Sequence, residues 1–432
     1  MAIDINFRFL YGNQPLATYF YAVPRLCLNL MGYWPERLHW RAYINFVVLA
    51  IGVATELHAG FRFATQGDTT LTLETFCPGV TSAVTLLKMF FLLQAREDLL
   101  YVLTKQRQML FPTVGQTPVK EQVMRRHFLL ACRLTFWPVS AGFSTSSLYN
   151  LKPLMVVLLL YLNGRTDEIV WGMPFNMTMP EWLLHAPFYP LTFIFIAYTG
   201  YVTIFMFGGC DAFYFEFCVN IATLFDFLQA DIHTLFQPYK DLPEISGDNG
   251  AVFEAILVKL IKRQNEIFEL TKYFRQRYAT ITLTYFISAS MVIGFSMFNL
   301  LTIGDIGMNI FLYVSYTVAA LSQLLIYCYG GTLVTESVSA QPVWIGQRTV
   351  FVTDSIFISF SCRALLAIVM GSAPWHQCLP KHRLYVQLFI MRSQRGITMA
   401  VPFFSPSLAA YTTILQTSGS IIALAKSFQP QA

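Results

Sequence analysis

The chain carries little charge for its length. Only 12% of its 432 residues are charged, whereas 55% are hydrophobic and 16% are aromatic. A soluble globular domain carries roughly 25% charged residues, because its surface must be hydrated. The mean hydropathy of +0.51 is high for the same reason. Much of the surface therefore faces something other than water, and the composition predicts an integral membrane protein in contact with membrane lipid.

Several chemical motifs are also missing. No CxxC pair and no Cys/His ligand spacing occurs, so neither a metal site nor a cofactor is predicted. Five cysteines lie in or beside apolar runs, where a free thiol packs as a small hydrophobic group: Cys77, Cys132, Cys210, Cys218 and Cys328. There is no nucleophile elbow, P-loop or HExxH, which argues against an enzyme. The net charge of +5 is spread over loops, which argues against nucleic-acid binding.

No cleavable signal peptide is predicted at the N-terminus. Its first thirty residues contain charged side chains and no clean apolar core followed by a small-residue cleavage site. The first membrane span must therefore direct insertion itself.

Long apolar runs recur along the chain. A membrane-spanning helix needs about 20 mainly apolar residues. Seven stretches meet this need: 41–61, 73–94, 129–160, 188–218, 279–303, 308–330 and 404–427. Segment 350–371 is a possible eighth, but Asp354 and Arg363 weaken it. The prediction is an all-α membrane protein with seven transmembrane helices.

Basic residues gather on one side of these spans. Three arginines precede the first span, and six, seven and six Lys or Arg residues fill the loops after spans two, four and six. The opposite side holds only Arg62, Lys152 and Arg165. Since basic loops stay in the cytoplasm, the N-terminus is predicted to be cytoplasmic and the C-terminus extracellular. A G-protein-coupled receptor has the opposite orientation, and its Asp-Arg-Tyr and Asn-Pro-x-x-Tyr motifs are missing here.

A single glycosylation motif fits this topology. Asn176-Met-Thr178 lies between spans three and four, on the predicted outer face, so Asn176 is a candidate acceptor.

Carboxylates near span ends do not suggest catalysis. Glu56 and His58 are two residues apart and point in different directions on a helix, so a solvated end of span one is the expected setting. Asp211, Glu216 and Asp226 are expected to mark where the fourth helix leaves the bilayer on the cytoplasmic side.

Segment 251–278 alternates apolar and basic residues at helical spacing. It is expected to continue span five into the cytoplasm as an amphipathic helix. Two alternatives remain open: the helix lies on lipid headgroups, or it packs in a cytoplasmic domain that holds subunits together.

Aromatic and hydroxyl side chains gather in the predicted outer half of spans two, three, four and six. Such a group suits an apolar pocket for a small volatile ligand. Helix packing and interfacial aromatic belts are the alternative for any one of them. The candidate pocket residues are Leu87, Phe91, Phe136, Trp137, Ser140, Phe143, Ser144, Tyr201, Phe205, Tyr313 and Tyr316.

The last span carries a polar stripe. Thr413, Thr417, Ser420, Leu424 and Phe428 fall on one helical face, and Gln416 lies beside it. Hydroxyls inside a membrane need water or a partner, so the stripe fits a hydrated pore with a hydrophobic gate at its outer end. Close helix packing through Ser418, Gly419 and Ser420 is the alternative.

Several motifs resemble those of insect odorant receptors. These are LIKRQNEI at 260–267, YCYGGTLVTES at 327–337, FIMRSQR at 389–395, PFFSPSL at 402–408 and ILQTS at 414–418. The resemblance is concentrated in residues 255–428, and elsewhere only the layout matches. It implies a ligand-gated, non-selective cation channel whose odorant-tuning subunit assembles as a tetramer with the odorant receptor co-receptor. The extra cytoplasmic insertion of the co-receptor is missing, so this chain resembles a tuning subunit.

The resemblance also implies sites and a domain layout. Leu424 and Phe428 would form the gate, and the pocket would lie among spans two, three, four and six. The layout is a cytoplasmic N-terminus (1–40), helices one to six (41–330) with cytoplasmic extensions near 219–278, a cytoplasmic connector (331–403) with a short anchor helix (382–395), and a pore helix (404–428). The expected location is the plasma membrane of olfactory neuron dendrites.

One segment departs from the family pattern. Residues 341–370 have no counterpart in the short connector that the family has there, and are interpreted as a loosely packed insertion or a retained intron. Two alternative functions remain. A gustatory-receptor-like channel would end in TYxxxxxQF, where this chain has TTILQTSGSII, and a transporter would show internal repeats, which are not found. The few charges and many aromatics favour a neutral aromatic or terpenoid ligand.

Overall fold

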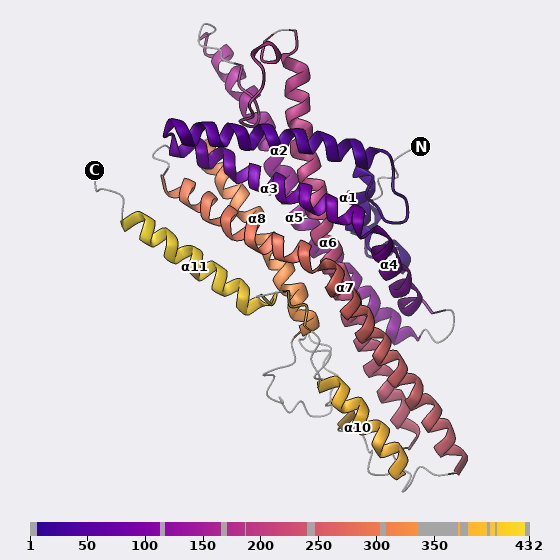
Figure 1. Cartoon of the computed structure of the whole chain (residues 1–432). Coiled ribbons are helices and arrows are strands. Elements are labelled where there is room, and N and C mark those ends of the chain that lie inside the picture. Colours follow the sequence, from indigo (N-terminus) through magenta and orange to yellow (C-terminus); the bar gives the residue numbers. More distant parts are fainter. Residues whose placement is uncertain are drawn as a thin grey trace.

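The computed structural model is all-helical (Figure 1). It describes residues 7–112, 117–165, 171–185, 187–239, 247–302, 308–335, 370–371, 379–394, 398–401 and 404–427. The α-helices are α1 (Ala22–Met31), α2 (Arg41–Gln66), α3 (Thr69–Gln94), α4 (Arg96–Leu110), α5 (Pro118–Leu162), α6 (Tyr189–Phe236), α7 (Gly247–Thr302), α8 (Met308–Thr335), α10 (Pro380–Gln394) and α11 (Leu408–Ser427). Short 3-10 turns are η1 (Arg8–Leu10), η2 (Leu16–Thr18), η4 (Glu181–Leu183) and η5 (Gln237–Tyr239).

Six helices in the described part of the chain are long and apolar enough to cross a membrane. They are α2, α3, α5, α6, α7 and α8. They cover the first six predicted spans, and the 20-residue α11 covers the seventh. The predicted all-α membrane architecture is therefore confirmed.

Local signals account for several helix boundaries. Asp68 caps α3 by accepting a hydrogen bond from the Leu71 backbone N–H at 2.9 Å. Thr117 caps α5, and Pro118 occupies its first turn, where no backbone donor is needed. Gly67 ends α2 with a φ of +80°, a left-handed conformation that favours glycine.

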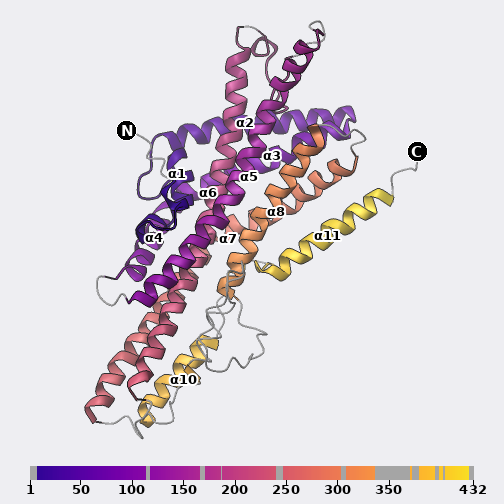
Figure 2. The same ribbon diagram turned by 180° about the vertical axis from the view of Figure 1, so that it is seen from behind.

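Helix α6 is the central element of the bundle (Figures 1 and 2). It packs against α1, α3, α5, α7 and α8, and the middle of this helix is almost wholly buried. Helices α2 and α3 pack side by side, and α11 lies at the edge of the bundle against α7 and α8. The chain before α11 is fixed to these neighbours, because the Phe404 ring lies 4.1 Å from the Phe286 ring and the Leu408 N–H donates to Thr332 Oγ1 at 3.0 Å.

At one end of the molecule, helix α10 packs against α7, which is 56 residues long (Figure 1). These two helices together are called the anchor layer. The Gln264 side chain donates to Ser393 Oγ at 2.7 Å, and Lys381 pairs with Glu254 at 2.8 Å. The stretches LIKRQNEI and FIMRSQR therefore contact each other. Helix α10 covers nearly all of the predicted anchor helix, whereas residues 341–369 of the unusual segment lie outside the described residues.

Candidate ligand-binding site

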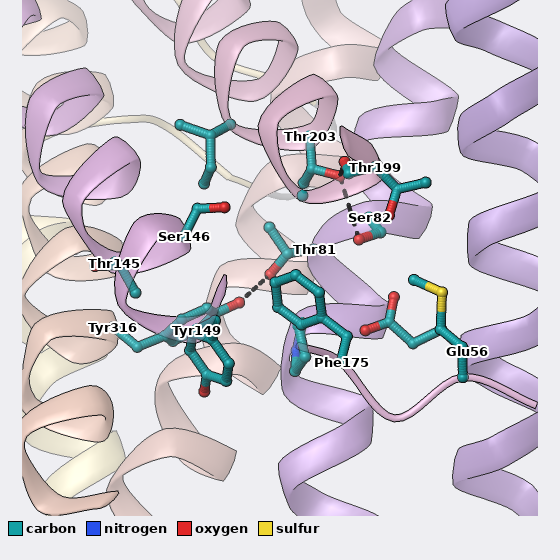
Figure 3. A pocket seen from close by; sticks show the side chains of 14 residues that line it. Glu56, Thr81, Ser82, Thr145, Ser146, Tyr149, Phe175, Thr199, Thr203 and Tyr316 are labelled. Atoms are coloured by element: carbon teal, nitrogen blue, oxygen red, sulfur yellow. Dashed lines mark hydrogen bonds between the residues drawn. The ribbon is translucent and has the colours of Figure 1, made fainter. Parts of the chain in front are cut away.

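A cavity lies between five helices and the loop that precedes α6 (Figure 3). About 430 Å³ between its walls is not filled by atoms, a volume that includes space open to solvent. Helices α2, α3, α5, α6 and α8 each contribute to its wall. The lining residues are Glu56, Pro78, Thr81, Ser82, Thr145, Ser146, Tyr149, Phe175, Met177, Thr199, Gly200, Thr203, Ile204 and Tyr316.

Two further spaces adjoin this cavity and share lining residues with it. An inner space of about 530 Å³ shares Thr81, Thr145, Ile204 and Tyr316, and extends between α5, α6, α7 and α8. An outer space of about 660 Å³ shares Pro78, Tyr149 and Phe175. Its remaining wall includes the ion pair between Lys152 and Glu74, at 3.4 Å. The three spaces form a series from a polar mouth to an apolar interior.

A glycine allows the loop to close over the cavity. A Cβ atom added at Gly200 would lie 2.9 Å from the Phe175 ring and 3.0 Å from Ser146 Oγ. The Phe175 ring stacks on Tyr149, with ring centroids 5.2 Å apart and planes inclined by 18°. Any larger residue at position 200 would therefore displace Phe175 from the cavity wall.

Hydroxyl groups on the wall are bonded within the protein. Figure 3 shows the bond between Thr81 and Tyr316 and the bond between Ser82 and Thr203, the latter at 3.3 Å. The Thr145 hydroxyl bonds Ser315 across the α5–α8 contact at 2.7 Å. These bonds satisfy polar groups that face an apolar space.

Glu56 is the one acidic side chain on this wall, and its setting contradicts the sequence-based expectation. It is 2% exposed rather than solvated, and its carboxyl group points from α2 into the cavity (Figure 3). His58 faces elsewhere, is exposed and bonds the Thr178 hydroxyl at 3.0 Å. The expected divergence of the two side chains is confirmed, but the exposure expected of Glu56 was wrong, because α3 and α6 cover this face of α2.

A buried ion pair lies beside the inner space. Lys88 of α3 pairs with Asp211 of α6 at 2.5 Å, with side-chain exposures of 1% and 3%. The Lys88 ammonium also lies 3.6 Å from the centroid of the Phe207 ring and 4.7 Å from that of Tyr285, two residues that line the inner space. Sequence reasoning missed Lys88, although a lysine inside an apolar span is itself a signal.

The expected role of the acidic residues after span four was therefore wrong for two of them. Asp211 and Glu216 are buried inside the protein, because α6 continues to Phe236 with other helices packed around it. Asp226 lies 3.3 Å from His127 and is partly exposed.

Comparison with known proteins decides the family. The profile described as 7tm Odorant receptor matches residues 68–340 and 359–419, which is more than half of the chain. The chain belongs to this odorant receptor family. Membership confirms the prediction of a receptor rather than an enzyme, and it sets aside the gustatory and transporter alternatives.

Sequence alignments with relatives cover almost the whole of this chain. This receptor is 54% identical to Odorant receptor 10a of Drosophila melanogaster, over 98% of this chain and 99% of the relative. It is 30% identical to Odorant receptor 24a of the same species, over 97% and 99%. Its fold is similar to that of the insect olfactory receptor OR5 from Machilis hrabei, with a TM-score of 0.74 over 97% of this chain and 99% of that one at 12% identity. The structure of OR5 in complex with eugenol has a TM-score of 0.72 over 98% and 100% of the two chains, at 13% identity.

The receptor brings only one of the eleven predicted pocket residues into the cavity wall. Tyr316 lines both the cavity and the inner space. Leu87, Trp137 and Phe143 are exposed on the outside of the helices, at 45%, 62% and 45%. The others lie elsewhere in the bundle, outside the lining of this cavity: Phe91, Phe136, Ser140, Ser144, Tyr201, Phe205 and Tyr313. Their role in ligand binding stays a prediction.

The predicted pore residues share one free face of α11. Thr413, Gln416, Thr417 and Ser420 are exposed, whereas Tyr411 and Ile414 pack against the core. The side chain of Leu424 and the whole of Phe428 lie outside the described residues.

The predicted glycosylation site lies beside the outer space. Asn176 is half-buried, and its side-chain amide donates to Thr75 Oγ1 at 3.2 Å. Its glycosylation stays a prediction.

Proposed function

We propose that this odorant receptor is the tuning subunit of a ligand-gated, non-selective cation channel that it forms with the odorant receptor co-receptor. A small neutral volatile binds in the cavity between α2, α3, α5, α6 and α8. The observation that carries this proposal is the cavity itself, which is mainly apolar and whose hydroxyls, except those of Ser146 and Tyr149, are bonded within the protein. The eugenol held by the OR5 structure supports an aromatic volatile as the kind of ligand.

The free face of α11 supports its role as a pore lining. Thr413, Thr417 and Ser420 each donate their hydroxyl proton to a backbone carbonyl of the same helix, at 2.9, 3.0 and 2.9 Å. The oxygen lone pairs therefore remain available on the exposed side, and oxygen acceptors replace part of the hydration shell of a cation. In this proposal four α11 helices surround the pore, with Leu424 and Phe428 as the gate.

Contacts between the cavity and α11 offer a route from binding to opening. Tyr316 of α8 lines the cavity, and the same helix continues to Thr332, which accepts the hydrogen bond from the Leu408 N–H at the start of α11. Tyr285 of α7 lines the inner space, and the next residue, Phe286, packs on Phe404. A ligand that shifts α7 or α8 therefore acts directly on the segment that positions the pore helix.

The orientation and assembly belong to the same proposal. The bias of basic residues supports a cytoplasmic N-terminus and an extracellular C-terminus in the plasma membrane of a sensory dendrite. The layer of α7 and α10 then lies in the cytoplasm, where its buried Phe253, Ile267 and Phe274 support a packed anchor domain for contact with the co-receptor.

Current recording tests the proposal. The receptor is expressed with the co-receptor in a heterologous cell and exposed to a panel of volatiles. Ile204→Trp fills the junction of the cavity and the inner space, and is expected to abolish the evoked current. Ile194→Trp, on the same helix but 64% exposed, is the matched control and is expected to respond normally. Equal responses of both variants would refute the assignment of the cavity.

A further inference from the structure

Three threonine hydroxyls on the cavity wall donate their protons to the backbone. Thr145 donates to the Ala141 carbonyl at 2.9 Å, Thr199 to the Ile196 carbonyl at 2.7 Å and Thr203 to the Thr199 carbonyl at 2.9 Å. A hydroxyl has one proton and two lone pairs. These groups therefore present only acceptor capacity to the cavity.

The remaining hydroxyls follow the same pattern, with two exceptions. Tyr316 and Thr81 each lie within hydrogen-bonding distance of the Cys77 carbonyl, at 3.0 and 3.1 Å, and of each other, so these contacts use both of their protons. Ser82 donates to Thr203, whose own proton is already directed to the backbone. Within the described residues, only the wall hydroxyls of Ser146 and Tyr149 lack such a bond, and each of these can donate or accept.

Glu56 adds both a donor and an acceptor. It faces the cavity from a residue that is 2% exposed. In the described part of the chain no Lys, Arg or His nitrogen pairs with Glu56, in contrast to Asp211 with Lys88 and Glu74 with Lys152. A carboxyl group buried without a cation is held as the neutral acid, which has one O–H donor and a carbonyl oxygen that accepts. A buried carbonyl oxygen without a partner is costly, so a ligand that donates to it gains affinity.

We propose that this cavity selects volatiles that carry a hydroxyl donor on a small apolar skeleton, such as phenols and aromatic alcohols, and that Glu56 accepts the hydrogen bond from that hydroxyl. The inference rests on the proposed function and adds the chemical class of the ligand. A methyl ether of the same skeleton fits the apolar wall equally well, but it has no proton to offer. The ether oxygen can accept from the acid O–H, but the carbonyl oxygen of Glu56 is then left without a partner, and the ether binds more weakly.

Matched pairs of odorants test the inference in cells that express the receptor with the co-receptor. The pairs are phenol and anisole, guaiacol and veratrole, and eugenol and methyl eugenol, which differ only in whether the hydroxyl is capped by a methyl group. The hydroxyl member is expected to reach its half-maximal current at about a tenfold lower concentration, the effect of one net hydrogen bond.

Two variants assign this preference to Glu56. Glu56→Met keeps the volume and removes the acceptor, so the two members of each pair should then differ by less than about threefold. Glu56→Gln keeps an acceptor oxygen beside an N–H donor, as in the neutral acid, so the preference for the hydroxyl compounds should be retained. Glu97→Met, on an exposed residue of α4, is the control and should keep the wild-type preference.

The outcomes separate this inference from the proposed function. Methyl ethers that activate the wild-type receptor as well as the hydroxyl compounds would overturn the donor preference and leave the odorant-gated channel intact. A preference unchanged in Glu56→Met, or lost in Glu56→Gln, would overturn the role of Glu56. If Glu56→Met does not reach the cell surface, the wild-type pairs and Glu56→Gln still decide. No current from any compound, with the receptor at the surface, would overturn both proposals.

Discussion

Removing Lys88 should destabilise the receptor more than removing its partner. In Lys88→Met the Asp211 carboxylate stays buried without a cation, and breaking a buried pair in this way costs about 3–5 kcal/mol. In Asp211→Asn the ammonium still lies over the Phe207 and Tyr285 rings, and cation–π attraction at a desolvated site contributes about 2 kcal/mol. Asp211→Asn should therefore lose less stability than Lys88→Met.

A double variant tests whether the loss of stability comes from the unpaired charge and not from the change in packing. Lys88→Met combined with Asp211→Leu removes both charges and keeps the volume, so much of the stability should return. The assay is thermal unfolding of the purified receptor in detergent, in which Lys88→Met should lower the midpoint by roughly 5 °C or more. A single variant Lys88→Met as stable as the wild type, or a double variant less stable than either single one, would refute the reasoning.

Four further predictions concern the pore helix, the anchor layer and the outer loop. Gly331→Ala places a methyl group against the Pro406 carbonyl, at a cost of about 1–3 kcal/mol, and should alter basal current, whereas Gly294→Ala, which meets open space, should not. Leu424→Ala should change basal current or ion selectivity while the order of preferred odorants stays the same; no change in either would place the gate elsewhere. Gln264→Leu removes the bond to Ser393, worth about 1 kcal/mol, and should reduce co-purification with the co-receptor, with the exposed Asn265→Leu as control. Asn176→Gln should abolish a glycosidase-sensitive gel shift that Asn163→Gln retains; a wild-type receptor without the shift would exclude the site.

The membrane spans were predictable because each is set by local composition. Runs such as 73–94 and 308–330 need about 20 apolar residues whatever their neighbours are, and α3 and α8 cover them closely. The motif stretches 260–267 and 389–395 likewise identified the family from the sequence alone. The lengths by which α5 and α6 extend beyond the predicted spans were harder to place, since a helix that packs on protein needs no continuous apolar run.

The cavity was not predictable in the same way, because the face that a helix turns inward depends on its neighbours. Aromatic residues such as Trp137 and Phe143 suggested a pocket, yet they are 62% and 45% exposed and line no part of this cavity. Its wall instead includes threonines, serines and one glycine, on helix faces that neighbouring helices cover. Thr199, Gly200 and Thr203 lie on one face of α6, and small polar residues at this spacing within an apolar span were the signal that was available.

The unbroken length of α7 has a mechanical consequence. With a rise of 1.5 Å per residue, its 56 residues extend for about 84 Å, whereas the apolar core of a bilayer is about 30 Å thick. Near one end Tyr285, Ser288 and Val292 line the inner space, and near the other Glu254 and Gln264 hold α10. The helix is therefore much longer than the bilayer requires, and in the proposed topology its longer part lies in the cytoplasm. A tilt of about 3° around the inner space would move α10 by roughly 2 Å, enough to change its packing against a neighbouring subunit of the proposed channel.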